Sequence, residues 1–408
     1  MRRMNDASPS RIEAQEAGPS TARLVLVFGL AGFASALTTR ALDPLLLSVA
    51  TDFSASTERV ALLASAYALP YALIQPLLGP VGDALGKRRV IVVCALILTA
   101  ALLLGAFANS LPLLFASRVL AGLSAGGITP LALATFGDAV PMAQRQVAMS
   151  RFMAWAIGGQ VAGGALSGLF AGVLGWRGVL AACAIATLLA ALVLRWDASR
   201  APDPARGRLD PAVALQRYRE ILTNPLALRL FTGVAIEGLL VFGMFPFLAA
   251  ILALRGIGGT AEAGLALGAF GLGGFVYAVL APLLVRGIGQ RNMMRLGGAC
   301  AALGLVLVAL APALPVLALA TLVLGLGYFM LHNSIQVRVT EVAPLARGSA
   351  VALHAFSFFM GQSLGPALFG LAQAGLGTVP TLAASAAGLT VLGFWLAAAL
   401  DRSARVGA

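Results

Sequence analysis

Four ionisable side chains stand inside long apolar stretches of this sequence, and their types suggest the chemistry of the protein. Glu237 lies about eleven residues into one stretch, Arg118 lies in another, and Arg40 and Asp43 lie three residues apart in a third. An ionisable group in such surroundings is a functional candidate by default, because its burial is costly. Residues three apart share one face of a helix, so Arg40 and Asp43 can form an ion pair.

Glu237 is our first candidate for a group that binds and releases protons, since a helix would place it ~16 Å from the start of its stretch. The alternative is a protonated Glu237 that only hydrogen-bonds between helices. Asp43 is the second candidate. Arg40 beside it favours the charged form, so we expect an ion pair that breaks and re-forms, or else a static pair. Arg118 is expected to tune a nearby carboxylate, or alternatively to reach the membrane surface, ~9 Å away.

Further polar and aromatic side chains inside the apolar stretches are expected to line a cavity. His332 and also His354 lie near the ends of their stretches, where a hydrogen-bonded packing role is the alternative to proton relay. The candidates for the cavity are Tyr67, Tyr71, Trp155, Gln160, Tyr277, Tyr328, His332, Asn333 and Gln362.

Other kinds of chemistry find little support in the sequence. We find no nucleophile–base pair, metal cluster or phosphate loop, so we expect no enzyme activity, no metal and no cofactor. Without a nucleotide-binding domain, ATP is not expected to be an energy source within this chain. Cys94, Cys183 and Cys300 all lie in apolar stretches, which argues against a disulfide framework.

The apolar stretches themselves define the fold class. With 60% hydrophobic residues and a mean hydropathy of +0.92, this chain could not offer water a polar surface. Twelve stretches have the ~20 residues that a helix needs to cross a bilayer. The sequence therefore predicts an all-α polytopic membrane protein with spans near 23–49, 60–80, 89–108, 112–136, 147–172, 177–195, 226–253, 262–285, 293–311, 315–338, 349–374 and 379–400.

The positive charge predicts the orientation of these spans. Of 28 basic residues, 23 fall in the tails, in alternate connections or at the adjoining helix ends. By the positive-inside rule, these segments face the cytoplasm. The net charge of +12 is therefore a topology signal, and we expect no nucleic-acid partner. The first twenty residues lack the apolar core of a secretory signal peptide and are expected to form a cytoplasmic tail.

The sequence also contains an internal repeat. Residues 159–169 align with residues 361–371 at an offset of 202, and Arg145 aligns with Arg347 at the same offset. Two related six-helix bundles are therefore expected, with a site between them near the middle of the membrane. The predicted divisions are a cytoplasmic tail at 1–22, bundles at 23–195 and 226–400, a linker at 196–225 and a second tail at 401–408.

The connection after the second span carries the most specific motif. Residues 79–88 read GPVGDALGKR and resemble the Gly-x-Leu-Ala-Asp-Arg-x-Gly-Arg-Lys motif of the major facilitator superfamily, although Ala84 replaces an arginine. The resemblance implies that Asp83 faces the start of the eleventh span and latches the cytoplasmic side. The alternative is that Asp83 only ends a helix. The candidate gate residues are Gly79, Asp83, Gly86, Lys87 and Arg88.

Two weaker motifs support the same resemblance. Residues 118–122 (RVLAG) are similar to the Arg-x-x-Gln-Gly motif of proton-coupled members, with Ala121 in place of glutamine. Residues 159–168 are similar to the family's antiporter motif, with Gly164 in place of its proline. Packing between helices, without any bearing on transport direction, is the alternative for this glycine-rich stretch.

The resemblance implies a transporter of the bacterial inner membrane that works by alternating access. We expect proton-driven efflux of a small organic solute, with the lipid bilayer, the solute and protons as its partners, and a monomeric chain. One alternative is an uptake symporter or uniporter for a sugar, an organic acid or a siderophore-like compound. Another is a scaffold or sensor that moves no solute and binds a cytoplasmic partner through residues 196–224.

Overall fold

The structure is a computed structural model that describes residues 20–200, 211–343 and 346–406. Over these residues the chain forms helices and short connections, without a strand. The helices, in chain order, are α1 (Thr21–Arg40), η3 (Asp43–Leu45), α2 (Leu46–Asp52), α3 (Thr57–Leu85), α4 (Lys87–Ala106), α5 (Leu111–Ala125), α6 (Ile128–Ala139), α7 (Met142–Arg200), α8 (Pro211–Leu222), α9 (Pro225–Phe242), η4 (Phe245–Phe247), α10 (Leu248–Leu254), α11 (Thr260–Leu310), α12 (Leu314–Val342), α13 (Arg347–Leu376) and α14 (Thr378–Val406).

The number of membrane-length helices follows from two glycine breaks. Ten helical segments of the described chain are long and apolar enough to cross a membrane. The two longest of them, in α7 and α11, contain 58 and 51 residues, far beyond the ~20 that one crossing needs. Each is interrupted by a glycine with positive φ, Gly175 at 63° and Gly289 at 71°. Counting each as two helices gives the twelve predicted, so the fold class is confirmed.

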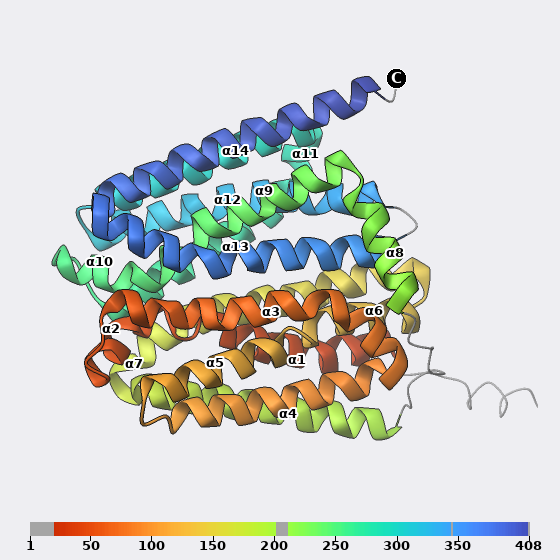
Figure 1. Cartoon of the computed structure of the whole chain (residues 1–408), viewed down its shortest axis with the longest axis horizontal. Coiled ribbons are helices and arrows are strands. Elements are labelled where there is room, and N and C mark those ends of the chain that lie inside the picture. The colour runs from red at the N-terminus through yellow and green to blue at the C-terminus, as the bar shows by residue number, and fades with distance from the viewer. Residues whose placement is uncertain (1–19, 201–210, 344–345, 407–408) are drawn as a thin grey trace, which may run out of the picture.

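The helices form two halves that lie against each other. In Figure 1, α1 to α7 occupy the lower half of the view and α9 to α14 the upper half. The halves contact each other mainly through two helix pairs, α3 with α13 and α7 with α11. This arrangement places any group on the inner side of these four helices at the junction of the halves.

The repeat seen in the sequence is also present in the packing. Gly159 of α7 packs on the backbone of Phe33 in α1, and a Cβ at Gly159 would lie 2.2 Å from the Phe33 carbonyl oxygen. Gly361 of α13 packs in the same way on Ala235 of α9. The two glycines are 361 − 159 = 202 residues apart, and the residues on which they pack are also 235 − 33 = 202 residues apart. The absence of a side chain at these glycines lets the two helices approach backbone to backbone.

Spans one and seven both bend before they cross fully. A short 3₁₀ helix that contains proline at its second position separates α1 from α2, and another separates α9 from α10. The prolines are Pro44 and Pro246, which are again 202 residues apart. Proline removes a backbone hydrogen bond and clashes with the preceding turn, which accounts for both interruptions. The ionisable residues Arg40 and Asp43 lie next to the first of these bends.

The two ends of the bundle differ in charge. We call the end with Lys87, Arg88, Arg291 and α8 the basic face (right in Figure 1), and the end with Asp52 and Arg177 the opposite face. At the basic face, the hydroxyl of Tyr218 in α8 donates to the backbone oxygen of Pro76 at 2.8 Å, so α8 is tied to α3.

The predicted domain boundaries remain predictions. The helix before the linker continues to Arg200, α8 covers Pro211–Leu222, and α9 begins at Pro225. Residues 201–210 and most of the predicted tail at 1–22 lie outside the described residues.

Candidate functional site

The first group of the candidate site is an acid–base pair in the second half. A hydrogen bond of 2.8 Å joins Oε2 of Glu237 in α9 and Nδ1 of His332 in α12. Glu237 is completely buried and the side chain of His332 is 14% exposed. A carboxyl group and an imidazole at this distance can share or exchange a proton, since each can donate or accept a hydrogen bond depending on its protonation.

Other groups of the second half surround this pair. The ring of His332 stacks on Tyr328 with a centroid distance of 5.2 Å, and lies 5.3 Å from the ring of His354. Oε1 of Glu237 and Nε2 of His354 are buried and make no hydrogen bond to protein within the described residues. These two atoms are therefore available for a proton, a water molecule or a polar group of a solute.

The second group links the two halves. Nη1 of Arg40 lies 3.2 Å from Oδ2 of Asp43, and both side chains are buried. Nη2 of the same arginine donates to Oε1 of Gln362, which belongs to α13 in the other half. The Arg40–Asp43 ion pair is therefore held at the junction of the halves.

An aromatic chain connects these two groups. The guanidinium of Arg40 lies 4.2 Å above the ring of Phe242, which in turn contacts Tyr328 edge to face at 5.2 Å. Tyr328 stacks on His332, the partner of Glu237. Packed side chains transmit small shifts in position to their neighbours. A change in the position of Glu237 can therefore shift Arg40.

Arg118 lies within the first half. Its guanidinium lies 4.3 Å above the ring of Tyr67, and both terminal nitrogens donate to the Thr38 carbonyl oxygen at 3.5 Å. Only 2% of Arg118 is exposed, so its side chain does not extend to the membrane surface. Tyr67 also hydrogen-bonds to the Thr38 hydroxyl at 3.0 Å.

The remaining aromatic and amide candidates lie in different places. Tyr71 contacts Phe359 across the junction, with ring centroids 3.8 Å apart. Trp155 packs edge to face on Phe33 at 6.1 Å, and Gln160 is partly exposed on the same helix. By contrast, Tyr277 hydrogen-bonds to Asn333 within the second half. It belongs to a separate small cluster with Met293 and Met330.

The gate motif lies at the basic face, and there Asp83 has a partner other than the one predicted. Lys87, the first residue of α4, bridges Asp83 of α3 at 2.9 Å and Asp138 of α6 at 2.6 Å. Gly86, with φ of 90°, ends α3, and Gly79 faces open space. Arg88 pairs with Asp197 at 2.8 Å. In the described residues Asp83 is paired with Lys87 alone, so its predicted contact with the start of α13 remains a prediction for another conformation.

Several residues of the site were not among the sequence candidates. These are Thr38, Phe242 and Phe358, of which Phe358 lies 4.7 Å from the ring of His332. His354, which the sequence offered as a proton relay or a packing residue, had a detectable signal, because it is one of only two histidines in the chain. Thr38 and the phenylalanines had none, since such residues are common in apolar helices and nothing local distinguishes them.

Two similar helical halves with buried ionisable groups at their junction define the class of secondary transporters. The comparison with known families agrees with this class and makes it specific. The sequence profile of the Major Facilitator Superfamily matches residues 28–366, and the chain belongs to this family. It is therefore a multi-pass membrane transporter and not an enzyme.

Individual relatives cover most of the chain. The uncharacterized MFS-type transporter YwfA of Bacillus subtilis is 26% identical over 396 residues, which are 96% of this chain and 95% of YwfA. A chloramphenicol resistance protein of Streptomyces lividans is 29% identical over 78% of this chain and 81% of its own length. The fold is similar to a bacterial homologue of the human lysosomal transporter Spinster, solved inward-facing and unoccupied, with a TM-score of 0.69 and 20% identity over 95% and 96% of the two chains.

Proposed function

We propose that this protein exports a small organic solute across the bacterial inner membrane in exchange for protons. The observation that carries the proposal is the connection between two buried groups, the Glu237–His332 pair and the Arg40–Asp43–Gln362 group at the junction of the halves. A proton that binds at the first group can thereby alter the contact that holds the halves together. Alternating access requires a link of this kind between ion binding and the movement of the halves.

The proposed cycle uses the residues in a defined order. Protonation of the Glu237–His332 pair changes its hydrogen bond, and the rings of Tyr328 and Phe242 transmit the change to Arg40. The hydrogen bond from Arg40 to Gln362 then breaks, and the halves separate around these two residues. Asp43 stays paired with Arg40 and keeps its guanidinium oriented after the contact with Gln362 has broken.

The surroundings of these groups support an organic solute with apolar and aromatic parts. Tyr71 and Phe359 meet across the junction, Phe358 lies beside the ring of His332, and Phe242 contacts Phe358. A surface lined by aromatic side chains can bind many solutes by apolar contact and stacking, without a fixed set of hydrogen bonds. Export is supported by the likeness to a chloramphenicol resistance protein over most of the chain.

The proposed orientation follows from charge. The basic face carries Lys87, Arg88, Arg89 and Arg291, and by the positive-inside rule it faces the cytoplasm. Both ends of the chain then lie in the cytoplasm, since the described chain enters and leaves the bundle on this face. Reporter fusions at the two ends test this orientation, and activity of a periplasm-specific reporter at either end would contradict it.

One observation favours a second candidate function, the uptake of an organic anion. Two arginines, Arg40 and Arg118, are buried near the junction, and Asp43 is the carboxylate paired there. The excess positive charge of this region suits a carboxylate or sulfonate solute. Uptake would then be driven by protons that move in the same direction as the solute.

Transport by purified protein in liposomes separates these functions. A panel of labelled organic cations, neutral aromatics and organic anions is tested for counterflow, and then for accumulation under an imposed pH gradient. An exchanger accumulates solute when the vesicle interior is acidic, whereas a symporter does so when the outside is acidic. Counterflow with no response to either gradient would contradict proton coupling, and the absence of any flux over the whole panel would favour a non-transporting scaffold.

A further inference from the structure

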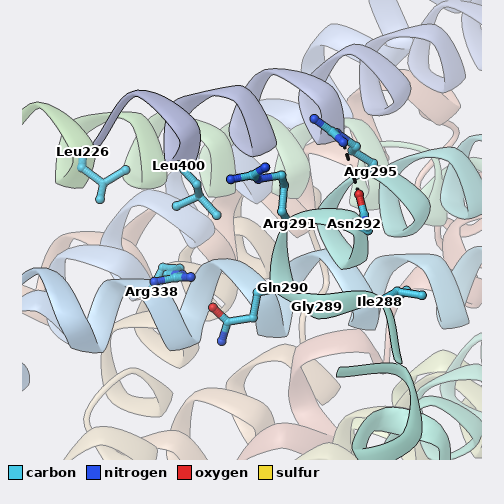
Figure 2. Close-up of a pocket in the computed structure, with 9 residues that line it drawn as sticks. All are labelled: Leu226, Ile288, Gly289, Gln290, Arg291, Asn292, Arg295, Arg338 and Leu400. Carbon is cyan, nitrogen blue, oxygen red and sulfur yellow. Dashed lines mark hydrogen bonds between the residues drawn. The ribbon is translucent and has the colours of Figure 1, made fainter. Parts of the chain in front are cut away.

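A second kind of site lies at the basic face, away from the junction of the halves. A pocket of about 640 Å³ opens there among α9, α11, α12 and α14 (Figure 2). Its volume falls within the range of ligand sites in proteins. None of the groups proposed to take part in transport lines it.

The lining of the pocket combines positive charge with an apolar part. Three arginines line it, namely Arg291, Arg295 and Arg338, and none of the nine residues that line it is acidic. Arg338 is also paired with Glu341 at 2.8 Å, and Arg295 contacts Asn292 at 3.2 Å. Figure 2 shows Arg291 beside Leu400 below α14, with Arg338 on the facing side of the pocket.

The backbone adds to the positive character of the pocket. Gly289, with φ of 71°, interrupts α11, and Gln290, Arg291 and Asn292 form the first turn of the helix that follows. The first N–H groups of a helix have no partner within it and favour an anion such as phosphate. Leu226, Ile288 and Leu400 supply the apolar part of the same pocket.

The first half carries a related pocket. It has a volume of about 340 Å³ and is lined by Arg88, Arg89 and Arg195 together with the exposed apolar residues Val93 and Leu96. The two pockets are related by the internal repeat. Gly86 precedes α4 and Gly289 precedes the second part of α11, and these glycines are 289 − 86 = 203 residues apart. Ala198 and Leu400 come from the last helix of each half and are 400 − 198 = 202 residues apart.

We propose that these two basic pockets each bind the phosphate headgroup of an anionic glycerophospholipid, one on each half. Guanidinium groups bind phosphate through paired hydrogen bonds, and the neighbouring apolar residues contact the start of the acyl chains. A soluble anion would gain nothing from Leu226, Ile288, Val93 or Leu96, which is why we favour lipid over free phosphate. Lipid bound at both pockets would anchor each half to the same leaflet at the basic face.

The experiment measures which lipids remain bound to the full chain. The protein is reconstituted with equal amounts of phosphatidylcholine and phosphatidylglycerol, transferred to mild detergent, and examined by native mass spectrometry. We expect retention of phosphatidylglycerol in preference to phosphatidylcholine. Replacement of Arg291 and Arg338 by glutamine should weaken retention about fivefold for each arginine removed. The pair Arg89→Gln and Arg195→Gln should reduce the remaining retention by a similar factor.

The matched control is Arg286→Gln, which removes an exposed positive charge from α11 without touching either pocket. It should leave retention unchanged. If the double variant is unstable, the exposed Arg291→Gln alone provides the same test. Equal retention of the two lipids, or equal retention by wild type and the pocket variants, would overturn the proposal. Displacement of the lipid by millimolar inorganic phosphate would also overturn it, because the pockets would then be sites for a soluble anion.

Discussion

His332 and Glu237 lie 95 residues apart in the chain, yet a hydrogen bond of 2.8 Å joins Nδ1 of the first to Oε2 of the second. Among the described residues, neither side chain makes another hydrogen bond to protein. An isolated buried carboxylate would be costly, and the imidazole reduces this cost when it shares the proton. The pair is therefore suited to hold one proton that can leave when the surroundings change.

Removal of the histidine should uncouple proton movement from transport. In His332→Leu, Glu237 loses its partner and is expected to remain protonated throughout the cycle. We expect solute accumulation driven by a pH gradient to fall at least about tenfold. Loss of a positioned proton-transfer group typically lowers a rate by more than this. Counterflow of the same solute should be retained. The control is Ser334→Ala, which removes a buried hydroxyl from the same turn of α12.

The contact between Arg40 and Gln362 should hold the halves together at the level of the site. Gln362→Leu removes a hydrogen bond to a charged group, which is worth about 1.5–3 kcal/mol. The equilibrium should therefore shift about tenfold or more toward states in which the halves are apart at this level. The measurement uses a chain without Cys94, Cys183 and Cys300 that carries one new cysteine near Phe242. If the halves separate more often, a thiol reagent should label this cysteine faster. Unchanged labelling would show that the hydrogen bond does not hold the halves, and Gln373→Leu on the same helix serves as the control.

The close approach of α13 and α9 should tolerate no side chain at Gly361. A Cβ at this position would lie 1.9 Å from the carbonyl oxygen of Ala235, which is backbone and cannot rotate away. We expect Gly361→Val to destabilise the protein by at least about 3 kcal/mol or to prevent folding. Gly172→Val is the matched control, because a Cβ there meets nothing within 4 Å. Similar thermal unfolding of the two variants in detergent would contradict the packing described for this helix pair.

Asp83 should matter in a conformation other than the present one. Here Asp83 is 53% exposed and pairs with Lys87 at the start of the next helix, so Asp83→Asn removes only an exposed ion pair of small energy. If Asp83 latches onto the start of α13 when the basic face closes, the variant should shift the equilibrium toward conformations in which the basic face is open. Labelling from the basic face of a cysteine introduced near Phe242 would then become faster. A variant that labels like the wild type would remove the argument for a latch.

The fold could be predicted because its signals are local. Each apolar stretch is long enough to cross a bilayer, and the glycines at 159 and 361 reveal the repeat without any structure. The effect of Pro44 is likewise local, and the 3₁₀ helix that contains it has a counterpart around Pro246. The breaks within α7 and α11 were predicted as well, because Gly175 and Gly289 lie between predicted spans, and the structure adds that each break is a glycine with positive φ.

The connections within the site could not be predicted, because they join distant segments. Glu237, Arg40 and Asp43 stood out by being ionisable in apolar surroundings, and the three-residue spacing of the last two predicted their contact. The partners of these groups depend on helix packing: Gln362 lies 322 residues from Arg40, and His332 was one of several polar residues with no sign of a link to Glu237. The pairing of Tyr277 with Asn333 shows that polar residues of the same helix can belong to separate clusters.

The most direct test of the account replaces Glu237 by glutamine, which keeps the shape of the side chain and cannot exchange a proton. Purified wild type and Glu237→Gln are reconstituted in liposomes with an acidic interior, together with the control Glu220→Gln on the surface of α8. We predict that Glu237→Gln fails to accumulate solute under the gradient while its counterflow remains near the wild-type rate. Gradient-driven accumulation by Glu237→Gln at the wild-type level would contradict the claim that this buried acid couples protons to transport.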